Sequence, residues 1–177
     1  MLVSGSGTNL QALIDAEIPI VAVASNVAGV RALERAVRIG VPTAVFVLDH
    51  YADRDARDSA MAEWLVAQGA HLVVCAGYMH LLRPAFLARF PGRVVNVHPA
   101  LLPAFPGAHA VEEALAAGAT ETGATVHLVD EGIDTGAVLR QEAVAVLPGD
   151  TPETLHARIR SVEHRLLPEV VRELIAA

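Results

Sequence analysis

Short apolar segments alternate with amphipathic segments over the first half of the chain. The apolar segments are rich in valine and alanine, and each predicts a buried strand, at 2–3, 18–24, 41–47, 71–76 and 93–97. Between them lie stretches with the apolar spacing of helices, at 8–17, 30–39, 53–68 and 84–90. Strands and helices that alternate in this way predict a parallel sheet built of βαβ units.

The pattern changes after residue 99. A segment rich in proline and glycine leads to a helix predicted at 110–117. Two apolar runs, 123–129 and 137–146, then follow with no helix between them, which favours antiparallel strands at an edge of the sheet. A last helix is predicted at 152–176, with Thr151 as its N-cap. The chain is therefore expected to be an α/β protein whose sheet is mostly parallel.

Composition agrees with one globular domain over residues 1–177. The chain is 53% hydrophobic and 19% charged, and its 13 basic and 20 acidic residues give a net charge of −7. This charge fits poorly with binding to nucleic acid or to an anionic membrane, and no apolar run approaches the roughly 18 residues of a membrane span. Because Cys75 is the single cysteine, it cannot form an internal disulfide, and we expect a cytoplasmic location. The absence of lysine excludes Schiff-base chemistry on this chain.

A glycine-rich loop between the first strand and the first helix is a candidate anion site. Gly7, Thr8 and Asn9 would present the free N–H groups of a helix start. A dinucleotide site is disfavoured, since Leu10 replaces the third glycine of that motif and Ser25–Asn26 stands where a ribose-binding acid is expected. The loop is better suited to a monophosphate, although an ordinary tight turn would look similar.

Candidate catalytic side chains lie in two other segments. Asn96 and His98 alternate along a strand and therefore share one face at its carboxyl end, where open α/β sheets bind ligands. Asp134 lies in a tight glycine-flanked loop. Asn96 and His98 could equally be a hydrogen-bonded polar pair that ends a strand. Asp134 could belong to a solvated acidic turn, an explanation that loses ground only if Asp134 meets His98. No histidine or cysteine pair has metal-ligand spacing, so no metal site is predicted.

Five segments, in chain order, carry a resemblance to a known family: SGSGTNLQALID, AGYMHLLRPAF, VVNVHPALLPAFPGAH, GATVHLVDEGIDTG and RIRSVEHRLLP. Together they closely resemble the phosphoribosylglycinamide formyltransferases, folate-dependent enzymes of purine synthesis. The resemblance implies a single Rossmann-like formyltransferase domain with helices on both faces of the sheet. Its N-terminal half would bind the phosphate of glycinamide ribonucleotide, and its C-terminal half would carry the folate and catalytic loops.

The resemblance also implies an activity: transfer of the formyl group of 10-formyltetrahydrofolate, a co-substrate, to the amine of 5′-phosphoribosylglycinamide in de novo purine (IMP) biosynthesis. Asn96 would bond the formyl oxygen, His98 would protonate the departing folate nitrogen, and Asp134 would hold His98 and favour its charged form. The ribonucleotide would be bound by Gly7, Thr8, Asn9, Arg160, Ser161, Val162 and Glu163. The folate would be bound by Arg54, Met79, His80, Leu81, Leu82, Asn96, Asp130, Glu131, Gly132, Ile133 and Asp134.

Three alternatives are weighed against this interpretation. A 10-formyltetrahydrofolate hydrolase would share Asn96, His98 and Asp134 but use water as the acceptor, and hydrolases generally carry an extra N-terminal domain for which we expect no room. A catalytically silent folate- or nucleotide-binding module could share the fold, yet the three polar residues are intact. A methionyl-tRNA formyltransferase is disfavoured by the acidic charge and by the lack of a C-terminal domain.

Two departures from the family pattern are visible. His80 stands where the family often has an arginine, so the folate pocket is expected to be tuned differently. The first strand has only two residues before its turn, and we therefore expect the chain to be trimmed at its start. The oligomeric state is left open, with a homodimer as one option.

Overall fold

A computed structural model describes residues 1–177 of the chain. Its seven strands form one sheet in the order β3-β2-β1-β4-β5-β6-β7, and the chain divides into two compact units, Met1–Val95 and Asn96–Ala177. The predicted α/β class is confirmed, with parallel strands followed by an antiparallel pair at one edge. The assignment of the whole chain to a single domain stays a prediction.

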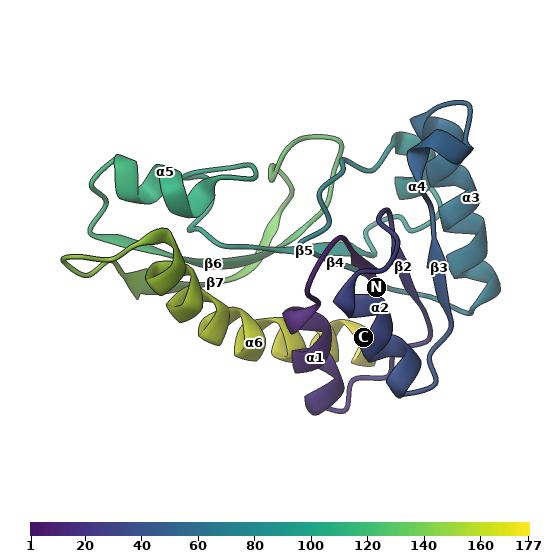
Figure 1. Cartoon of the computed structure of the whole chain (residues 1–177), viewed down its shortest axis with the longest axis horizontal. Coiled ribbons are helices and arrows are strands. Elements are labelled where there is room, and N and C mark those ends of the chain that lie inside the picture. The colour runs from purple at the N-terminus through teal and green to yellow at the C-terminus, as the bar shows by residue number, and fades with distance from the viewer. The chain divides into compact units, whose positions relative to one another are not determined.

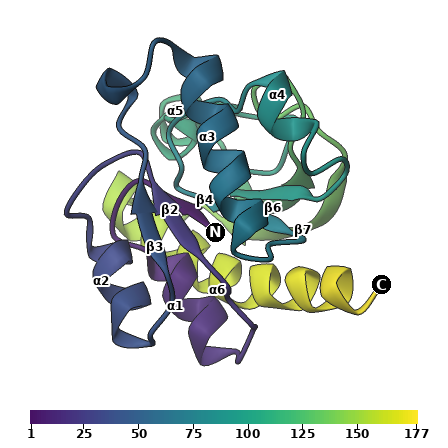
Figure 2. The ribbon, with the colours of Figure 1, turned by 90° about the vertical axis from the view of Figure 1, so that its right-hand side faces the viewer.

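The first unit is a set of βαβ repeats. Its strands are β1 (Leu2–Val3), β2 (Val23–Ser25), β3 (Thr43–Val45) and β4 (Val73–Ala76), and its helices are α1 (Thr8–Asp15), α2 (Arg31–Arg38), α3 (Arg54–Ala67) and α4 (Pro84–Leu87), with a 3-10 turn at Leu48–His50. β1 pairs in parallel with both β2 and β4, and β2 pairs in parallel with β3. Figures 1 and 2 show α1 and α2 on one face of these strands and α3 on the other.

The strands of this unit are shorter than the apolar pattern predicts. The predicted strand at 18–24 is wrong over residues 18–22, because β2 begins at Val23. Pro19 has no N–H to donate to a ladder, and Val21 is 44% exposed, so these residues connect α1 to the strand instead. Cys75 is buried in β4, and burial raises the pKa of its thiol to about 12, which agrees with an inert core residue.

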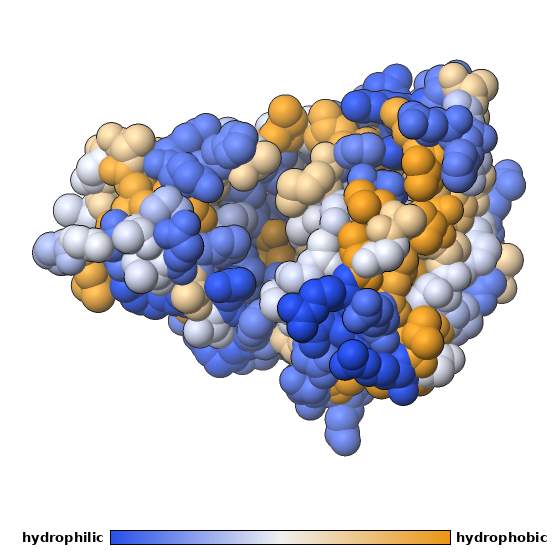
Figure 3. All heavy atoms as spheres, in the orientation of Figure 1, coloured by the Kyte–Doolittle hydropathy of each residue, from blue (hydrophilic) through white to orange (hydrophobic).

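Helix α2 has the amphipathic character that its sequence predicts. Ala32 and Ala36 are fully buried against the strands, whereas Arg31, Glu34 and Arg38 are exposed. The strongly hydrophilic patch in Figure 3 lies where Figure 1 draws this helix. The small buried alanines let α2 approach the chain beneath it closely, which becomes important at the glycine-rich loop.

The second unit consists of an antiparallel strand pair and two helices. Strand β5 (Val94–His98) crosses from the first unit into it and is followed by α5 (Ala110–Ala116), β6 (Glu121–Leu128), β7 (Val138–Ala145) and α6 (Pro152–Ala176). β6 and β7 pair from Glu121↔Ala145 to His127↔Val138, with an irregularity at Val126/His127. Figure 1 shows α6 running along this pair. The predicted edge strands are thereby confirmed.

Helix α6 begins and ends where its sequence predicts. Thr151 accepts a hydrogen bond from the Thr154 N–H, the Thr154 hydroxyl accepts one from the Thr151 N–H, and Pro152 occupies the first turn. Its apolar stripe, which includes Leu155, Ile159 and Leu166, is buried. No helix of the structure is long and apolar enough to cross a membrane.

Candidate active site

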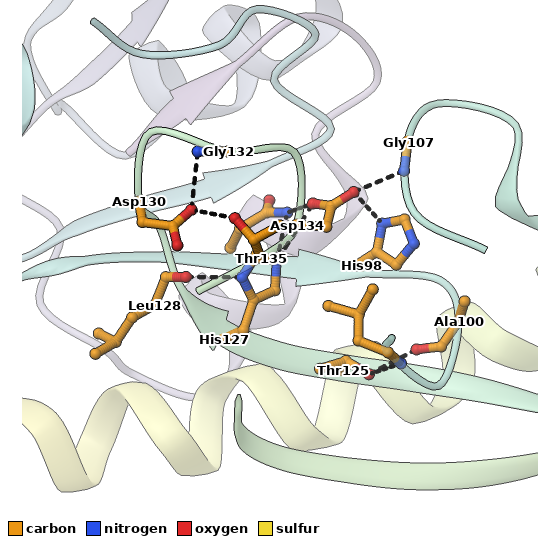
Figure 4. Close-up of polar contacts among 12 residues, drawn as sticks. His98, Ala100, Gly107, Thr125, His127, Leu128, Asp130, Gly132, Asp134 and Thr135 are labelled. Carbon is orange, nitrogen blue, oxygen red and sulfur yellow. Dashed lines mark hydrogen bonds and ion pairs between the residues drawn. The ribbon is translucent and has the colours of Figure 1, made fainter. Parts of the chain in front are cut away.

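Asn96 and His98 lie together at one end of β5, as their spacing predicts, and the structure brings Asp134 beside both. The His98 Nδ1 lies 3.3 Å from Asp134 Oδ2, and the Asn96 Nδ2 lies 3.4 Å from Asp134 Oδ1. The carboxylate therefore contacts both strand residues. Figure 4 shows His98 and Asp134 facing one another. This contact removes the ordinary explanation of Asp134 as a solvated turn.

Asp134 is held ionised by its surroundings. Its backbone has φ 53°, in the left-handed region, which costs a non-glycine residue about 1–3 kcal/mol and is common at functional sites. Burial alone would raise the pKa of its carboxyl group, but hydrogen bonds from His127 and from the Gly107 N–H (2.8 Å), with the nearby His98 ring, lower that pKa to about 2. The group therefore carries a negative charge throughout the physiological pH range.

His98 faces a hydrogen-bond acceptor at each ring nitrogen. Nδ1 faces the Asp134 carboxylate, and Nε2 lies 2.8 Å from the Phe105 carbonyl oxygen. Because neither partner can donate, both contacts are satisfied only when both nitrogens carry protons. The ring is 4% exposed, so little water competes for these positions. The arrangement accommodates a charged imidazolium that is poised to give up one proton.

His127 is a neighbour whose contacts the sequence did not specify. Its Nδ1 lies 2.8 Å from the Leu128 carbonyl oxygen, and its Nε2 lies 3.2 Å from Asn96 Nδ2 and 3.4 Å from Asp134 Oδ1. The ring is 2% exposed. It contacts two of the three candidate catalytic residues, and the only sequence signal for it was its place in the same motif as Asp134.

The chain segments around the site are tied down by residues that sequence reasoning missed. The Thr125 hydroxyl donates to the Ala100 carbonyl (2.6 Å) and accepts from the Leu102 N–H (3.2 Å), while the Gln141 amide donates to the Leu102 carbonyl (2.7 Å). Figure 4 includes the Thr125–Ala100 contact. These bonds anchor the segment after β5 to the β6–β7 pair. Polar residues on predicted edge strands gave no signal of this role.

The loop that carries Asp134 is closed by its own contacts. The Asp130 carboxylate accepts from the Gly132 N–H (3.0 Å) and from the Thr135 hydroxyl (2.6 Å). A Cβ on Gly136 would lie 1.8 Å from the Leu128 carbonyl oxygen, so only glycine allows this close approach. Within the same loop Glu131 is exposed and Ile133 exposes 53% of its surface. The loop thus offers charged and apolar groups beside the catalytic cluster.

The glycine-rich loop lies at the start of α1 in the first unit. Gly7 is the N-cap residue of α1, with φ 70°. No side-chain cap binds the N–H groups of the first turn of this helix. Arg35 of α2 holds the loop by donating from Nε to the Ser6 carbonyl (3.0 Å) and from Nη1 to the Gln11 side chain (2.8 Å). Nothing in the sequence indicated that Arg35 of α2 binds this loop.

Gly7→Ala is expected to destabilise the protein by at least about 2 kcal/mol. The positive φ costs an alanine about 1–2 kcal/mol, and its Cβ would lie only 2.6 Å from the Ala32 Cβ. Thermal unfolding measures the change. Gly5→Ala is the matched control, because a Cβ at Gly5 meets nothing within 4 Å. Equal unfolding midpoints for the two variants would contradict this account of Gly7.

The other predicted binding residues occupy several elements. Arg54 is exposed at the first turn of α3, and Met79 and Leu81 expose 62% and 45% of their surfaces in the segment after β4. His80 is half-buried there, and Leu82 is buried. Residues 160–163 lie within α6, where Glu163 is buried and Ser161 is exposed. No group of three or more His, Cys, Asp or Glu side chains has the arrangement of a metal site.

Comparison with known proteins identifies the family. The chain matches the Formyl transferase family model over residues 1–171. It is 49% identical to the phosphoribosylglycinamide formyltransferase of Mycobacterium tuberculosis in an alignment 178 residues long that covers 98% of this chain and 83% of that protein. The chain belongs to the phosphoribosylglycinamide formyltransferase family. The resemblance in the five sequence motifs is thereby confirmed.

Solved structures extend this likeness to the fold. The glycinamide ribonucleotide transformylase 1 of Symbiobacterium toebii superposes with a TM-score of 0.94 at 48% identity, covering 97% of this chain and 84% of that one. The chain also matches one part of longer proteins. The chain is 45% identical to the trifunctional purine biosynthetic protein adenosine-3 of Drosophila pseudoobscura pseudoobscura over 97% of its own length but spans 13% of that protein.

Proposed function

We propose that the chain transfers the formyl group of 10-formyltetrahydrofolate to the amine of 5′-phosphoribosylglycinamide, in de novo purine biosynthesis. The observation that carries this proposal is the contact of Asp134 with both His98 and Asn96 at the end of β5. Membership of the phosphoribosylglycinamide formyltransferase family supports both the acceptor and the folate donor. A hydrogen-bond donor, a proton donor and a fixed carboxylate are what formyl transfer between two nitrogens requires.

The reaction is a direct attack of the amine on the formyl carbon. The amine nitrogen forms a bond to that carbon, the formyl oxygen becomes an oxyanion, and the bond to folate N10 then breaks. N10 gains a proton from His98, and the proton lost from the amine nitrogen passes to solvent, from which His98 regains its own, so protons balance. Donors that are already oriented toward the oxyanion can each contribute about 3 kcal/mol to the transition state. The chain needs no nucleophilic side chain for this route.

His98 is the proton donor in this scheme. Its Nδ1–H is directed at Asp134, which leaves the Nε2–H as the proton available for transfer. Folate N10 would replace the Phe105 carbonyl as the partner of Nε2 at the moment of transfer. A carboxylate fixed at Nδ1 stabilises the imidazolium before the transfer and keeps the ring oriented after it.

Asn96 stabilises the oxyanion, and the Asp134 carboxylate orients its amide. Asp134 Oδ1 accepts from Asn96 Nδ2 and from His127 Nε2, each 3.4 Å away, while the Leu128 carbonyl accepts from His127 Nδ1. An acceptor at this position holds the Asn96 nitrogen, rather than its oxygen, on the side of Asp134. One N–H of the amide is then directed at Asp134, and the second is available to the formyl oxygen.

The remaining contacts are divided between the two substrates. The phosphate of the ribonucleotide is held by Gly7, Thr8 and Asn9, since no side chain caps the first turn of α1. Residues 160–163 of α6 contact the same substrate. The folate is held by Arg54, by residues 79–82 and by residues 130–134, whose exposed Met79, Leu81 and Ile133 offer apolar surface to its ring. A cytoplasmic location, independence of metal ions and the homodimer stay predictions.

The test follows the absorbance change as 10-formyltetrahydrofolate, or its 5,8-dideaza analogue, loses the formyl group. We expect this loss only when glycinamide ribonucleotide is present, with one formylated product formed per formyl group lost. Loss without the ribonucleotide would assign the chain to the hydrolases. No loss in either case, with binding of the folate still measurable, would leave a silent binding module. EDTA is included in one arm, and we expect it to have no effect on the rate.

A further inference from the structure

A buried ion pair on α3 begins a chain of polar contacts that the proposed mechanism does not use. Arg57 and Asp58 are both fully buried. The Arg57 Nε donates to Asp58 Oδ1 (2.8 Å), and its Nη2 lies 2.6 Å from the same oxygen. The amphipathic pattern of α3 would place these charges on the surface. Buried charges are costly unless every partner is satisfied, so their remaining contacts are informative.

The next contact of this pair fixes the tautomer of His80. The Arg57 Nη1 is in hydrogen-bond contact with His80 Nδ1. Because a guanidinium only donates, Nδ1 must accept, and a neutral His80 then carries its proton on Nε2. That nitrogen lies 3.4 Å from the Asn26 side-chain amide. In the structure the Asn26 nitrogen occupies this position, and the Asn26 oxygen accepts from the Ser4 hydroxyl. An Nε2–H needs an acceptor, so proton counting favours the amide turned by 180°, with its oxygen toward His80.

These polar contacts end on the backbone of the segment that contains His80. Asn26 Oδ1 lies 2.5 Å from Ser4 Oγ in the structure, and Ser4 Oγ accepts from the Met79 N–H (3.0 Å). The Asn26 amide therefore contacts Ser4 in either orientation. Asp58 Oδ2 accepts from the Arg83 N–H (2.8 Å). The backbone of residues 79–83 is thus held at both ends by side chains of one connected network, and His80 is the link at its centre.

The charges around His80 favour its neutral form. Burial lowers the pKa of His80, and Arg57 and then Arg54 lower it further, while Asp58 alone among the facing acids opposes them. The Tyr78 ring packs edge-on against the imidazole and supplies no negative charge at neutral pH. Protonation would convert Nδ1 from an acceptor into a donor facing a guanidinium, which would break the contact with Arg57.

We propose that His80 is a positioning residue for the folate donor: its neutral imidazole links Arg57 to Asn26 and so fixes residues 79–82 in the conformation that binds the folate. This inference rests on the proposed function, because it concerns the donor of that reaction. Both ring nitrogens are engaged inside the protein. His80 therefore acts through the backbone that it holds and through the outward-facing Met79 and Leu81.

The test compares His80→Phe, Asn26→Leu and the double variant, with His71→Phe as the control at an exposed histidine. We expect His80→Phe to raise the KM for the formyl folate about 10-fold and to change kcat and the KM for glycinamide ribonucleotide less than about 3-fold. The folate KM of the double variant is expected to be little higher than that of either single variant, because one substitution already interrupts the line of polar contacts. An unchanged folate KM, or an equal rise for both substrates, would overturn the proposal.

A pH series separates positioning from simple packing. In the wild-type protein the folate KM is expected to rise as the pH falls below 6.5, the ordinary pKa of a histidine, because the pKa of His80 lies lower than that. In His80→Gln, which stays neutral, this rise should be absent. A rise of the same size in His80→Gln would show that another group is responsible and would reject the role of His80.

Two further readouts keep the proposal testable if the variants fold poorly. The 15N chemical shifts of the His80 ring in the wild-type protein show which nitrogen carries the proton, and we expect Nε2–H; an Nδ1–H ring would refute the network.

Wild-type transfer that depends on the ribonucleotide is measured first. If it is absent, the proposed function fails, whereas intact transfer with an unaltered His80→Phe rejects this inference alone.

Discussion

His98→Ala is expected to lower kcat by about 10²–10⁴-fold, the usual contribution of a well-placed general acid. The wild-type ring meets Asp134 at Nδ1 and offers its Nε2–H to the reaction, and alanine removes both contacts. Because the loss concerns proton transfer to the departing nitrogen, it should appear in kcat. The KM values of the two substrates should change much less. Steady-state rates with each substrate varied in turn measure this split.

Folding of the His98→Ala variant is checked independently. The ring is buried, so its removal leaves a cavity that lowers the unfolding midpoint, but Asp134 keeps its bonds to Gly107 and His127. We therefore expect a cooperative thermal transition and an unchanged circular dichroism spectrum. His71→Ala, at an exposed position, is the control for the loss of a histidine. Turnover of His98→Ala within about 10-fold of the wild type would remove His98 from the role of general acid.

Local signals were sufficient to predict some elements of this fold. The N-cap at Thr151 followed by Pro152 predicted the start of α6, and the structure places both as expected. The strand at 18–24 was predicted too long, because an apolar run does not by itself reveal which residues find a partner strand. Hydrophobicity identifies what is able to be buried, whereas pairing is decided by the rest of the sheet.

The site shows the same division between local and distant information. Strand alternation was enough to place Asn96 and His98 on one face. The approach of Asp134 depends on a left-handed backbone and on the Gly107 N–H, and both are products of the tertiary structure. The burial of Arg57 could not be predicted from the sequence either, because an arginine in an amphipathic helix is usually solvated.

Asp134→Asn is expected to lower kcat about 10²–10³-fold while preserving the fold. Asparagine is close in shape, tolerates the left-handed backbone of this position and can still accept from the Gly107 N–H. It lacks the charge that favours the imidazolium of His98. Steady-state kcat values of the variant and the wild type, measured with each substrate varied in turn, provide the comparison.

A pH-dependent change in stability is expected from the same substitution. The pKa of the Asp134 carboxyl is depressed to about 2, so its ionised form stabilises the folded state above the pKa of the unfolded chain, about 3.9. That stabilisation is lost as the pH falls through about 2. Asp134→Asn should thus unfold at a lower temperature than the wild type near neutral pH, and the difference should close in strong acid. If the two proteins unfold alike near neutral pH while kcat still falls, the carboxylate acts in catalysis without stabilising the fold, and our explanation of its low pKa is wrong.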